Sequence, residues 1–479
     1  MRRAVAAAAA VVAAAGLAAG YAGLDVAGAV PGPLTTTPAP TAAALPTAPA
    51  AALPDGPAPA VAPALDPDAP APDPAVLGGQ VAPLLADPAL GAPASVSASV
   101  VDAATGEVLL ADDVDVPRTP ASVTKLLTAA AALRALGPTS RVTTRVVEGA
   151  TADEVVLVAG GDVLLAAGAG DADAVNGHAG LADLAARTAA ALLAQGRSAV
   201  AVRLDDSAFT GPATSPGWGS GDVAAGFVAP ISPLAVDGGR LAPGETAPRA
   251  PDPALAAAQA FARALGAAGV QVLDQGGGAL VRAAAQPGAA TLAAVESATT
   301  AEQVELMLTT SDNTLAEVLA RRVAAAGDRP ATFDDASEAV VQQVAALGVD
   351  VTGVRLQGAS GLGRGTRIPA RALTDLLVLV AGGEHPELAA VASGLAVADV
   401  NGTLADRYDV PASAAGAGVV RAKTGTLTGV SSLAGLLRDA DGRLLAFAVL
   451  SDGVAPGASL AARRAQDRST AALVGCGCR

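Results

Sequence analysis

Patterns typical of β-hairpins lie near both ends of the folded part of this chain, and helical patterns lie between them. Near the start, residues 95–113 alternate small apolar and polar side chains on both sides of a turn at Thr105-Gly106. Near the end, residues 431–451 form two apolar runs joined across Asp441-Gly442. This order predicts one antiparallel sheet assembled from both ends of the chain and flanked by helices.

A helix of about four turns is predicted within residues 119–138, where apolar residues recur at helical spacing between a leading proline and a Gly137-Pro138 stop. A last helix is expected over residues 458–474. Between them, helices are expected around residues 302–308 and 314–325.

The start of the helix over 314–325 has a sequence marker of its own. Thr314 stands three residues before Glu317, which is the spacing of a capping box. We therefore expect this helix to begin at Thr314.

The segment from 146 to 295 differs in character from its surroundings. Short valine and leucine runs alternate there with loops rich in glycine, proline and aspartate. We interpret it as an α+β insertion, which a chain of 479 residues is long enough to hold beside a main domain.

The N-terminal region predicts export. Arg2 and Arg3 precede an uncharged, largely apolar stretch, so residues 1–29 resemble a secretory signal, and a retained membrane anchor is the alternative. Residues 30–75 are rich in proline and alanine and predict an extended linker.

Composition excludes several classes of function. A net charge of -15 argues against nucleic-acid binding. Cys476 and Cys478 are too few for a disulfide framework. His178 and His385 lack metal-ligand spacing, so neither a zinc site nor a cofactor is predicted. No signature of a Ser-His-Asp triad is present.

The chain has only two lysines, Lys125 and Lys423, and every other strongly basic residue is arginine. A GC-rich coding bias accounts for the overall scarcity of lysine. It does not account for where the two lysines lie.

Ser122 and Lys125 are three residues apart, so both side chains face the same side of the predicted helix. The free N–H groups of a helix start favour a serine that becomes an oxyanion. A neutral lysine can take the hydroxyl proton, which a guanidinium cannot do. Alternatively, Ser122 is only a helix cap.

Two further patterns supply polar groups. Ser311-Asp312-Asn313 lies in the turn between two predicted helices, and its hydroxyl and amide are suited to proton transfer and substrate binding. An Asx turn is the simpler interpretation. The run Lys423-Thr424-Gly425-Thr426 lies at the end of a predicted strand, where glycine permits close approach of a ligand. A solvated strand lysine is the alternative there.

Ser-x-x-Lys, Ser-x-Asn and Lys-Thr-Gly in this order are the combination of penicillin-binding proteins and class A β-lactamases. The chain resembles low-molecular-mass penicillin-binding D-alanyl-D-alanine carboxypeptidases/endopeptidases with a large insertion between the first two motifs, here Lys125 to Ser311. The segments "VAGGD", "GWGSGDVAAGFVAPISPLAVDGG", "SGLGR" and "VADVNGTLADR" add to the resemblance, which covers roughly Val76 to Val474. The chain departs from it at Gly358-Ala359 and at Gly363.

The resemblance implies an α+β, β-lactamase/transpeptidase-like fold with a large α+β insertion. The transpeptidase-like domain would comprise residues 76–145 and 296–475, and the insertion residues 146–295.

By the same resemblance, Ser122 is the nucleophile, Lys125 the general base and Ser311 the proton relay. The backbone N–H groups of Ser122 and Thr426 form the oxyanion hole. Substrate is bound by five residues, namely Asn313, Lys423, Thr424, Gly425 and Thr426.

The implied function is a serine D-Ala-D-Ala carboxypeptidase or endopeptidase that acts on peptidoglycan stem peptides and is inhibited by β-lactams. It would act in the cell envelope or outside the cell. The alternatives are a serine β-lactamase and a non-catalytic wall-binding scaffold with the same fold. The sequence does not indicate an oligomeric state.

Overall fold

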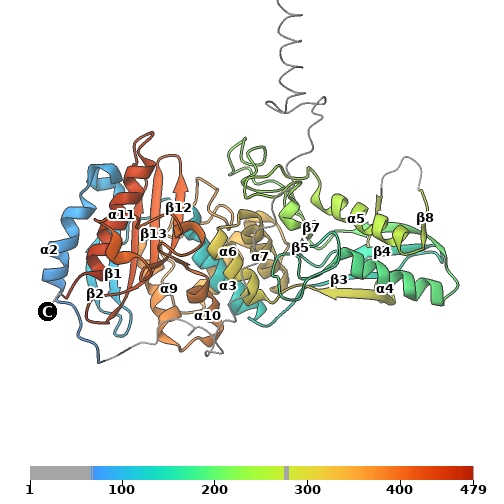
Figure 1. The fold of residues 1–479 in the computed structure, drawn as a ribbon, viewed down its shortest axis with the longest axis horizontal. Helices are drawn as coiled ribbons and strands as arrows, with labels where there is room; N and C mark the ends of the chain where they lie inside the picture. The colour runs from blue at the N-terminus through green and yellow to red at the C-terminus, as the bar shows by residue number, and fades with distance from the viewer. Residues whose placement is uncertain (1–65, 67, 275–279, 478–479) are drawn as a thin grey trace, which may run out of the picture. The chain divides into compact units, whose positions relative to one another are not determined.

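The computed structural model describes residues 66, 68–274 and 280–477 (Figure 1). Three predictions concern regions largely or wholly outside the described residues: the signal or anchor over 1–29, nearly all of the linker over 30–75, and Cys478.

A helix that the sequence does not predict, α2 (Pro74–Leu85), precedes the first hairpin. Asp73 caps it by accepting hydrogen bonds from two backbone N–H groups of the first turn. Pro74 fits the first helical position because its missing N–H needs no partner there. The helix therefore begins at the end of the predicted linker.

The main sheet has six strands in the order β11-β12-β13-β14-β1-β2. Its strands are β1 (Val96–Asp102), β2 (Val108–Asp112), β11 (Ala396–Val397), β12 (Arg421–Leu427), β13 (Val430–Arg438) and β14 (Leu444–Ser451). Every neighbouring pair is antiparallel, and β1 of the early hairpin pairs with β14 of the late one. The predicted antiparallel sheet built from both chain ends is confirmed.

Both faces of the main sheet are covered, as the alternation along β14 shows. Phe447 lies in the same apolar core as α2 and α11 (Ser459–Val474). Ala446 and Ala448 lie in the core that includes α9 (Ala370–Gly382). Burial on both faces explains why β14 is a continuous apolar run.

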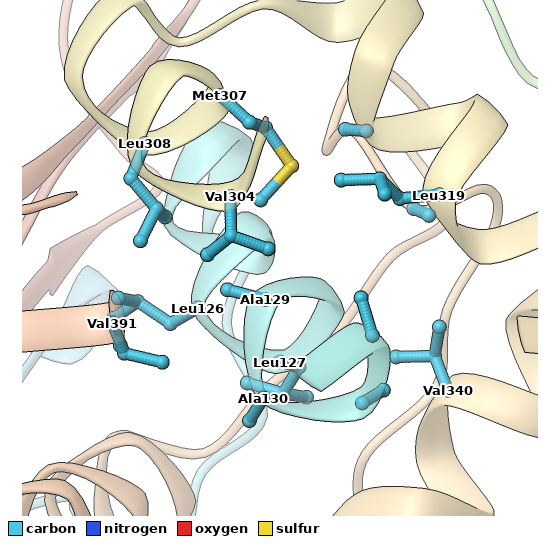
Figure 2. Close-up of a cluster of buried hydrophobic side chains, with 14 of the residues drawn as sticks. Leu126, Leu127, Ala129, Ala130, Val304, Met307, Leu308, Leu319, Val340 and Val391 are labelled. Atoms are coloured by element: carbon cyan, nitrogen blue, oxygen red, sulfur yellow. The ribbon is translucent and has the colours of Figure 1, made fainter. Parts of the chain in front are cut away.

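Helix α3 (Lys125–Leu136) runs through the centre of the larger core. Figure 2 shows its Leu126 and Leu127 facing side chains of other helices. The surrounding helices are α6 (Thr300–Thr310), α7 (Asn313–Ala326), α8 (Phe333–Ala345) and α10 (Ala389–Gly394). Because α3 is buried on nearly every side, the residues at its N-terminal end have a fixed position.

The helix caps near the second motif differ from the prediction. Helix α7 begins at Asn313 with Asp312 as its N-cap, and Thr314 lies inside the helix. The predicted capping box at Thr314 is therefore wrong. A complete capping box exists one helix earlier, where Thr299 and Glu302 cap α6.

The segment between α3 and α6 forms a second sheet of mixed direction, in the order β10-β3-β4-β6-β8, with β9 also paired to β6. Its strands are β3 (Thr143–Glu148), β4 (Glu154–Val158), β6 (Ala199–Asp205), β8 (Gln271–Val272), β9 (Val281–Arg282) and β10 (Thr291–Glu296). Strand β6 is parallel to β4, β8 and β9.

This second sheet has a hydrophobic core of its own, built with α4 (Leu181–Ala194) and α5 (Pro253–Ala267). Two short strands, β5 (Asp162–Leu165) and β7 (Leu234–Val236), pair separately in parallel. We propose on this basis that 146–295 is an inserted domain, and that 76–145 and 296–475 together form the main one.

Among the described residues, no single helix is both long and apolar enough to cross a membrane. Only α9 taken together with residues Pro386–Gly394 meets that test, and these two helices are bent by 108°.

Candidate active site

Ser122 lies in a 3-10 turn, Ala121–Thr124, that leads directly into α3. Ala121 has a φ of +49°, in the left-handed region that costs an L-residue on the order of 1–2 kcal/mol. The turn is confined from outside, because a Cβ atom on Gly361 would lie 2.0 Å from the Ala121 carbonyl oxygen. The strained turn is thus held by packing beside a half-buried serine.

Lys125 follows Ser122 by almost one turn, and its side chain is fully buried. Its Nζ lies 3.0 Å from Ser122 Oγ, 2.6 Å from Asn313 Oδ1 and 2.7 Å from the Ser360 carbonyl oxygen. The last two atoms can only accept hydrogen bonds. Two N–H groups of the amine are therefore committed, and its third position faces Ser122.

Burial lowers the pKa of Lys125 to about 7, although the charges of Asp312 and Glu317 act to raise it. A large share of the Lys125 side chains is therefore neutral near pH 7. A neutral amine has a lone pair, and the geometry directs it at the serine hydroxyl.

The second motif forms the turn between α6 and α7. Ser311 occupies the left-handed region with a φ of +60°. Asp312 accepts a hydrogen bond from Leu315 N and so caps α7. Asn313 Nδ2 donates to the Phe227 carbonyl oxygen over 2.9 Å, while its Oδ1 accepts from the lysine of the first motif. The turn is therefore tied to both the first motif and the inserted segment.

Lys423 lies in β12, and its side chain is also fully buried. Its Nζ donates to Ser311 Oγ over 2.9 Å and to the Thr424 carbonyl oxygen over 3.0 Å. Burial lowers the pKa of Lys423 well below its usual range, the charge of Lys125 lowers it further, and Glu245 acts in the opposite direction. Because like charges oppose each other, a proton on one amine disfavours a proton on the other.

Gly425 lets β12 pass directly against the serine turn. A Cβ atom there would lie 2.4 Å from the Pro120 carbonyl oxygen and 3.2 Å from Ser122 N. No larger residue fits without moving the backbone, so glycine brings the strand beside Ser122. Thr424 Oγ1 donates to Thr403 Oγ1.

The structure therefore brings together the two lysines, the two serines, Asn313 and Gly425, whereas the hydroxyls of Thr424 and Thr426 bond to Thr403 and Arg463. Ser122, Lys125 and Asn313 form one hydrogen-bonded group. Ser311 and Lys423 form a second group, joined to the first through the turn that carries Ser311 and Asn313.

Glu317, which was predicted only as part of a capping box, also belongs to the site. Its buried carboxylate accepts hydrogen bonds from Ala359 N, Ser360 N and Ser360 Oγ. It thereby fixes the carbonyl group that accepts from Lys125. The available signal was spacing: Glu317 follows Asn313 by four residues, which places both on one helix face.

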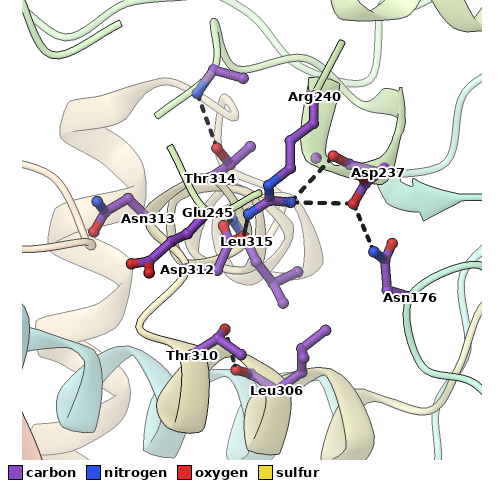
Figure 3. Close-up of polar contacts among 12 residues, drawn as sticks. Asn176, Asp237, Arg240, Glu245, Leu306, Thr310, Asp312, Asn313, Thr314 and Leu315 are labelled. Carbon is purple, nitrogen blue, oxygen red and sulfur yellow. Dashed lines mark hydrogen bonds and ion pairs between the residues drawn. The ribbon is translucent and has the colours of Figure 1, made fainter. Parts of the chain in front are cut away.

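Two arginines of the site have no sequence signature. Arg463 of α11 donates to Thr426 Oγ1 over 3.3 Å. Arg240 Nη2 forms an ion pair with Asp312 Oδ2 over 2.8 Å. Figure 3 shows Arg240 with Asp237 at its other side.

A cavity of about 620 Å³ opens at the second motif. Its walls include the motif itself and residues of the inserted segment, among them Phe227, Arg240, Glu245, Ser311, Asp312 and Asn313. The cavity is large enough for a peptide, but its walls do not include Ser122, Lys125 or Lys423, so it adjoins the reacting groups through the second motif. Within the part of the chain that the structure describes, no three His, Cys, Asp or Glu side chains form a metal-binding group.

This geometry is suited to acyl transfer, because it combines a serine on a strained turn, an amine with a free lone pair beside it, a second hydroxyl and a second amine.

Curated relatives have closely matching sequences. The chain is 38% identical over 418 residues to a carboxypeptidase from Mycolicibacterium smegmatis, and the match covers 86% of this chain and 87% of that protein. It is also 38% identical over 398 residues to a carboxypeptidase from Mycobacterium tuberculosis, covering 82% of each.

Solved structures show the same fold. Penicillin-binding protein 4 from Haemophilus influenzae matches with a TM-score of 0.65 and 20% identity, over 83% of this chain and 98% of that chain. The predicted α+β, transpeptidase-like fold is thereby confirmed.

The family model described as the D-Ala-D-Ala carboxypeptidase 3 (S13) family matches residues 77–251 and 242–473. With the motifs, the fold and the relatives in agreement, the chain belongs to the D-Ala-D-Ala carboxypeptidase 3 (S13) family.

Proposed function

We propose that this protein is a serine D-Ala-D-Ala carboxypeptidase or endopeptidase that cleaves peptidoglycan stem peptides through an acyl-enzyme on Ser122. Family membership supports the activity. The observation that carries the assignment of roles is the set of three contacts at Lys125 Nζ.

Lys125 acts as the general base. With its two N–H groups on Asn313 Oδ1 and the Ser360 carbonyl, its lone pair accepts the Ser122 proton. Ser122 Oγ then forms a bond to the substrate carbonyl carbon. General-base catalysis of this kind contributes on the order of 10²–10⁴-fold.

Two backbone N–H groups, those of Ser122 and Thr426, stabilise the oxyanion that forms on the substrate carbonyl. The close approach of β12 to the serine turn at Gly425 supports this assignment. Each such donor contributes about 3 kcal/mol to transition-state stabilisation.

As the peptide C–N bond breaks, Ser311 relays to the leaving amine the proton that Lys125 took from Ser122. Lys423 and the hydroxyls of Thr424 and Thr426 hold the terminal carboxylate, while Asn313 binds the substrate amide. A carboxylate beside Lys423 favours its charged form, and this in turn favours a neutral Lys125. Water then releases the acyl group.

A β-lactam acylates the same serine and leaves slowly. A relative of the same fold, penicillin-binding protein 4 from Haemophilus influenzae, has been solved in complex with a β-lactam, with a TM-score of 0.58 and 21% identity over 78% of this chain and 95% of that chain. The family match favours the peptidase over a serine β-lactamase or a non-catalytic scaffold.

The protein acts in the cell envelope, where its peptidoglycan substrate lies. The signal-like N-terminal sequence supports export, by a cleaved signal or with a retained anchor.

The test uses purified protein and a Ser122→Ala variant with a fluorescent penicillin and with a peptide ending in D-Ala-D-Ala. We expect covalent label and D-alanine release from the parent only. Label on both proteins contradicts the assignment of Ser122. Fast hydrolysis of a chromogenic cephalosporin without D-alanine release contradicts the peptidase.

A further inference from the structure

The turn Ser311-Asp312-Asn313 controls both halves of the site. Ser311 reaches Lys423 over 2.9 Å, and Asn313 reaches Lys125 over 2.6 Å. A rotation of this turn would therefore disturb both amines together. Ser311 is also in the left-handed region, so the turn needs contacts that hold it in place.

Asp312, the central residue of the turn, is half-buried as a whole, but its side chain is only 9% exposed. One carboxylate oxygen caps α7 through Leu315 N, and the other receives Arg240 Nη2 over 2.8 Å. A buried carboxylate without a cation partner is strongly unfavourable. The conformation of the turn thus depends on an arginine that lies outside all three motifs.

Arg240 is itself directed by neighbours in the inserted segment. Its Nη1 donates to the Asp237 carbonyl oxygen and to Asp237 Oδ1 over 3.2 and 3.3 Å. Asn176 Nδ2 donates to the same Oδ1 over 2.6 Å. Figure 3 shows this chain of contacts from Asn176 through Asp237 to Arg240. The planar guanidinium can satisfy both aspartates at once, which an ammonium cannot do with the same geometry.

We propose that Arg240 is a positioning residue for the reaction, which acts by fixing Asp312 so that Ser311 and Asn313 meet their lysines. The inserted segment then supplies part of the catalytic geometry in addition to lining the cavity. This inference rests on the proposed function.

Removal of the Arg240 charge is expected to change the pH dependence of activity. Lys125 faces the carboxylates of Asp312 and Glu317 and the amine of Lys423. Arg240 and, more weakly, Arg249 offset the charge of Asp312. When Arg240 is removed, Asp312 keeps the Leu315 N–H and the charge of Arg249, and its carboxylate, no longer paired with Arg240, acts more strongly to raise the pKa of Lys125. The acid limb of the activity profile then moves to higher pH.

The experiment compares Arg240→Ala and Arg240→Lys with the parent, by D-alanine release across pH, and corrects each rate for active protein by penicillin titration. Arg282→Ala is the matched control, because Arg282 also pairs with two aspartates of the inserted segment but does not line the cavity at the second motif. Thermal unfolding shows whether each variant is folded.

We expect Arg240→Ala to lose on the order of 10²-fold in kcat, as a misplaced catalytic group does, with a smaller change in KM and an acid limb at higher pH. Arg240→Lys should keep the acid limb in place and recover part of kcat. Arg282→Ala should match the parent.

Two results would overturn the proposal. One is a loss of active protein in Arg240→Ala with normal kcat and pH profile per active site, which indicates a structural role only. The other is an acid limb that stays in place or moves to lower pH. If the parent takes up no penicillin label and releases no D-alanine, the proposed function is wrong. This outcome differs from failure of the Arg240 proposal alone, in which the parent is active.

Discussion

The two buried lysines differ in what surrounds them. Lys125 is saturated by the protein, since two carbonyl oxygens and a serine hydroxyl occupy its three positions. Lys423 donates to the Ser311 hydroxyl and to the carbonyl of Thr424, and the charges that act on it are those of Lys125 and Glu245. The first environment is complete without substrate. No carboxylate of the described residues forms an ion pair with Lys423, and we propose that the substrate carboxylate takes this place.

The largest loss of activity is expected when Lys125 is replaced. Lys125→Ala should reduce kcat for D-alanine release by on the order of 10²–10⁴-fold, because Lys125 Nζ is the group that the described residues place in hydrogen-bond contact with Ser122 Oγ. The rate of penicillin labelling should fall with it. Equal rates in variant and parent would show that another base serves Ser122.

Lys423→Ala tests whether Lys423 binds the substrate carboxylate. Loss of a charged hydrogen bond to the substrate carboxylate is worth about 1.5–3 kcal/mol. We therefore expect KM to rise by roughly tenfold to 100-fold for a peptide with a free carboxylate. A peptide amide should show a much smaller change. An equal rise in KM for the peptide acid and the peptide amide would show that Lys423 does not bind the substrate carboxylate.

Glu317→Gln tests how the charge of Glu317 affects the pKa of Lys125. The parent should lose activity as pH falls through about 7, because the pKa of Lys125 is about 7 and its ammonium is inactive as a base. The Glu317 carboxylate raises that pKa, so its removal should move the acid limb to lower pH.

The glutamine also places an NH₂ group against backbone donors, and it should lower the free energy of unfolding by about 1–3 kcal/mol. A pH-rate profile and a denaturant titration measure the two effects. An acid limb that does not move would show that the Glu317 charge does not reach Lys125.

The smallest effect concerns Arg463, which donates to Thr426 Oγ1 at the same end of the site as Lys423. Because Arg463 is largely exposed, we expect Arg463→Ala to raise KM only about threefold, in keeping with a contribution below 1 kcal/mol for exposed charges. Steady-state kinetics measure it, with kcat as the internal control. A change in kcat alone would place Arg463 in a different role.

The catalytic residues that belong to short motifs with fixed spacing could be predicted from the sequence. Ser122 and Lys125 lie one turn apart, and Lys423 and Gly425 lie on one strand, so local geometry suffices for each pattern. The two hairpin patterns also predicted an antiparallel sheet built from both ends of the chain, but not the order of its strands.

The supporting residues were not predictable in this way. Arg240 lies 72 residues from Asp312, and Glu317 lies 43 residues from Ser360. Only the folded chain brings them together. The capping prediction failed for a related reason: Asp312 is itself the N-cap, and the Thr314 hydroxyl is occupied by Ala229 N of the inserted segment.

The pairing of β1 with β14 has a consequence for biosynthesis. Asp102 at the end of β1 forms a buried ion pair with Arg443, 341 residues later. The sheet can therefore close only after nearly the whole polypeptide has left the ribosome, and contacts this distant in sequence slow folding. A stop codon between Leu427 and Leu444 would give a product that contains all three motifs but lacks β14, so that β1 and β13 would each lose a pairing partner.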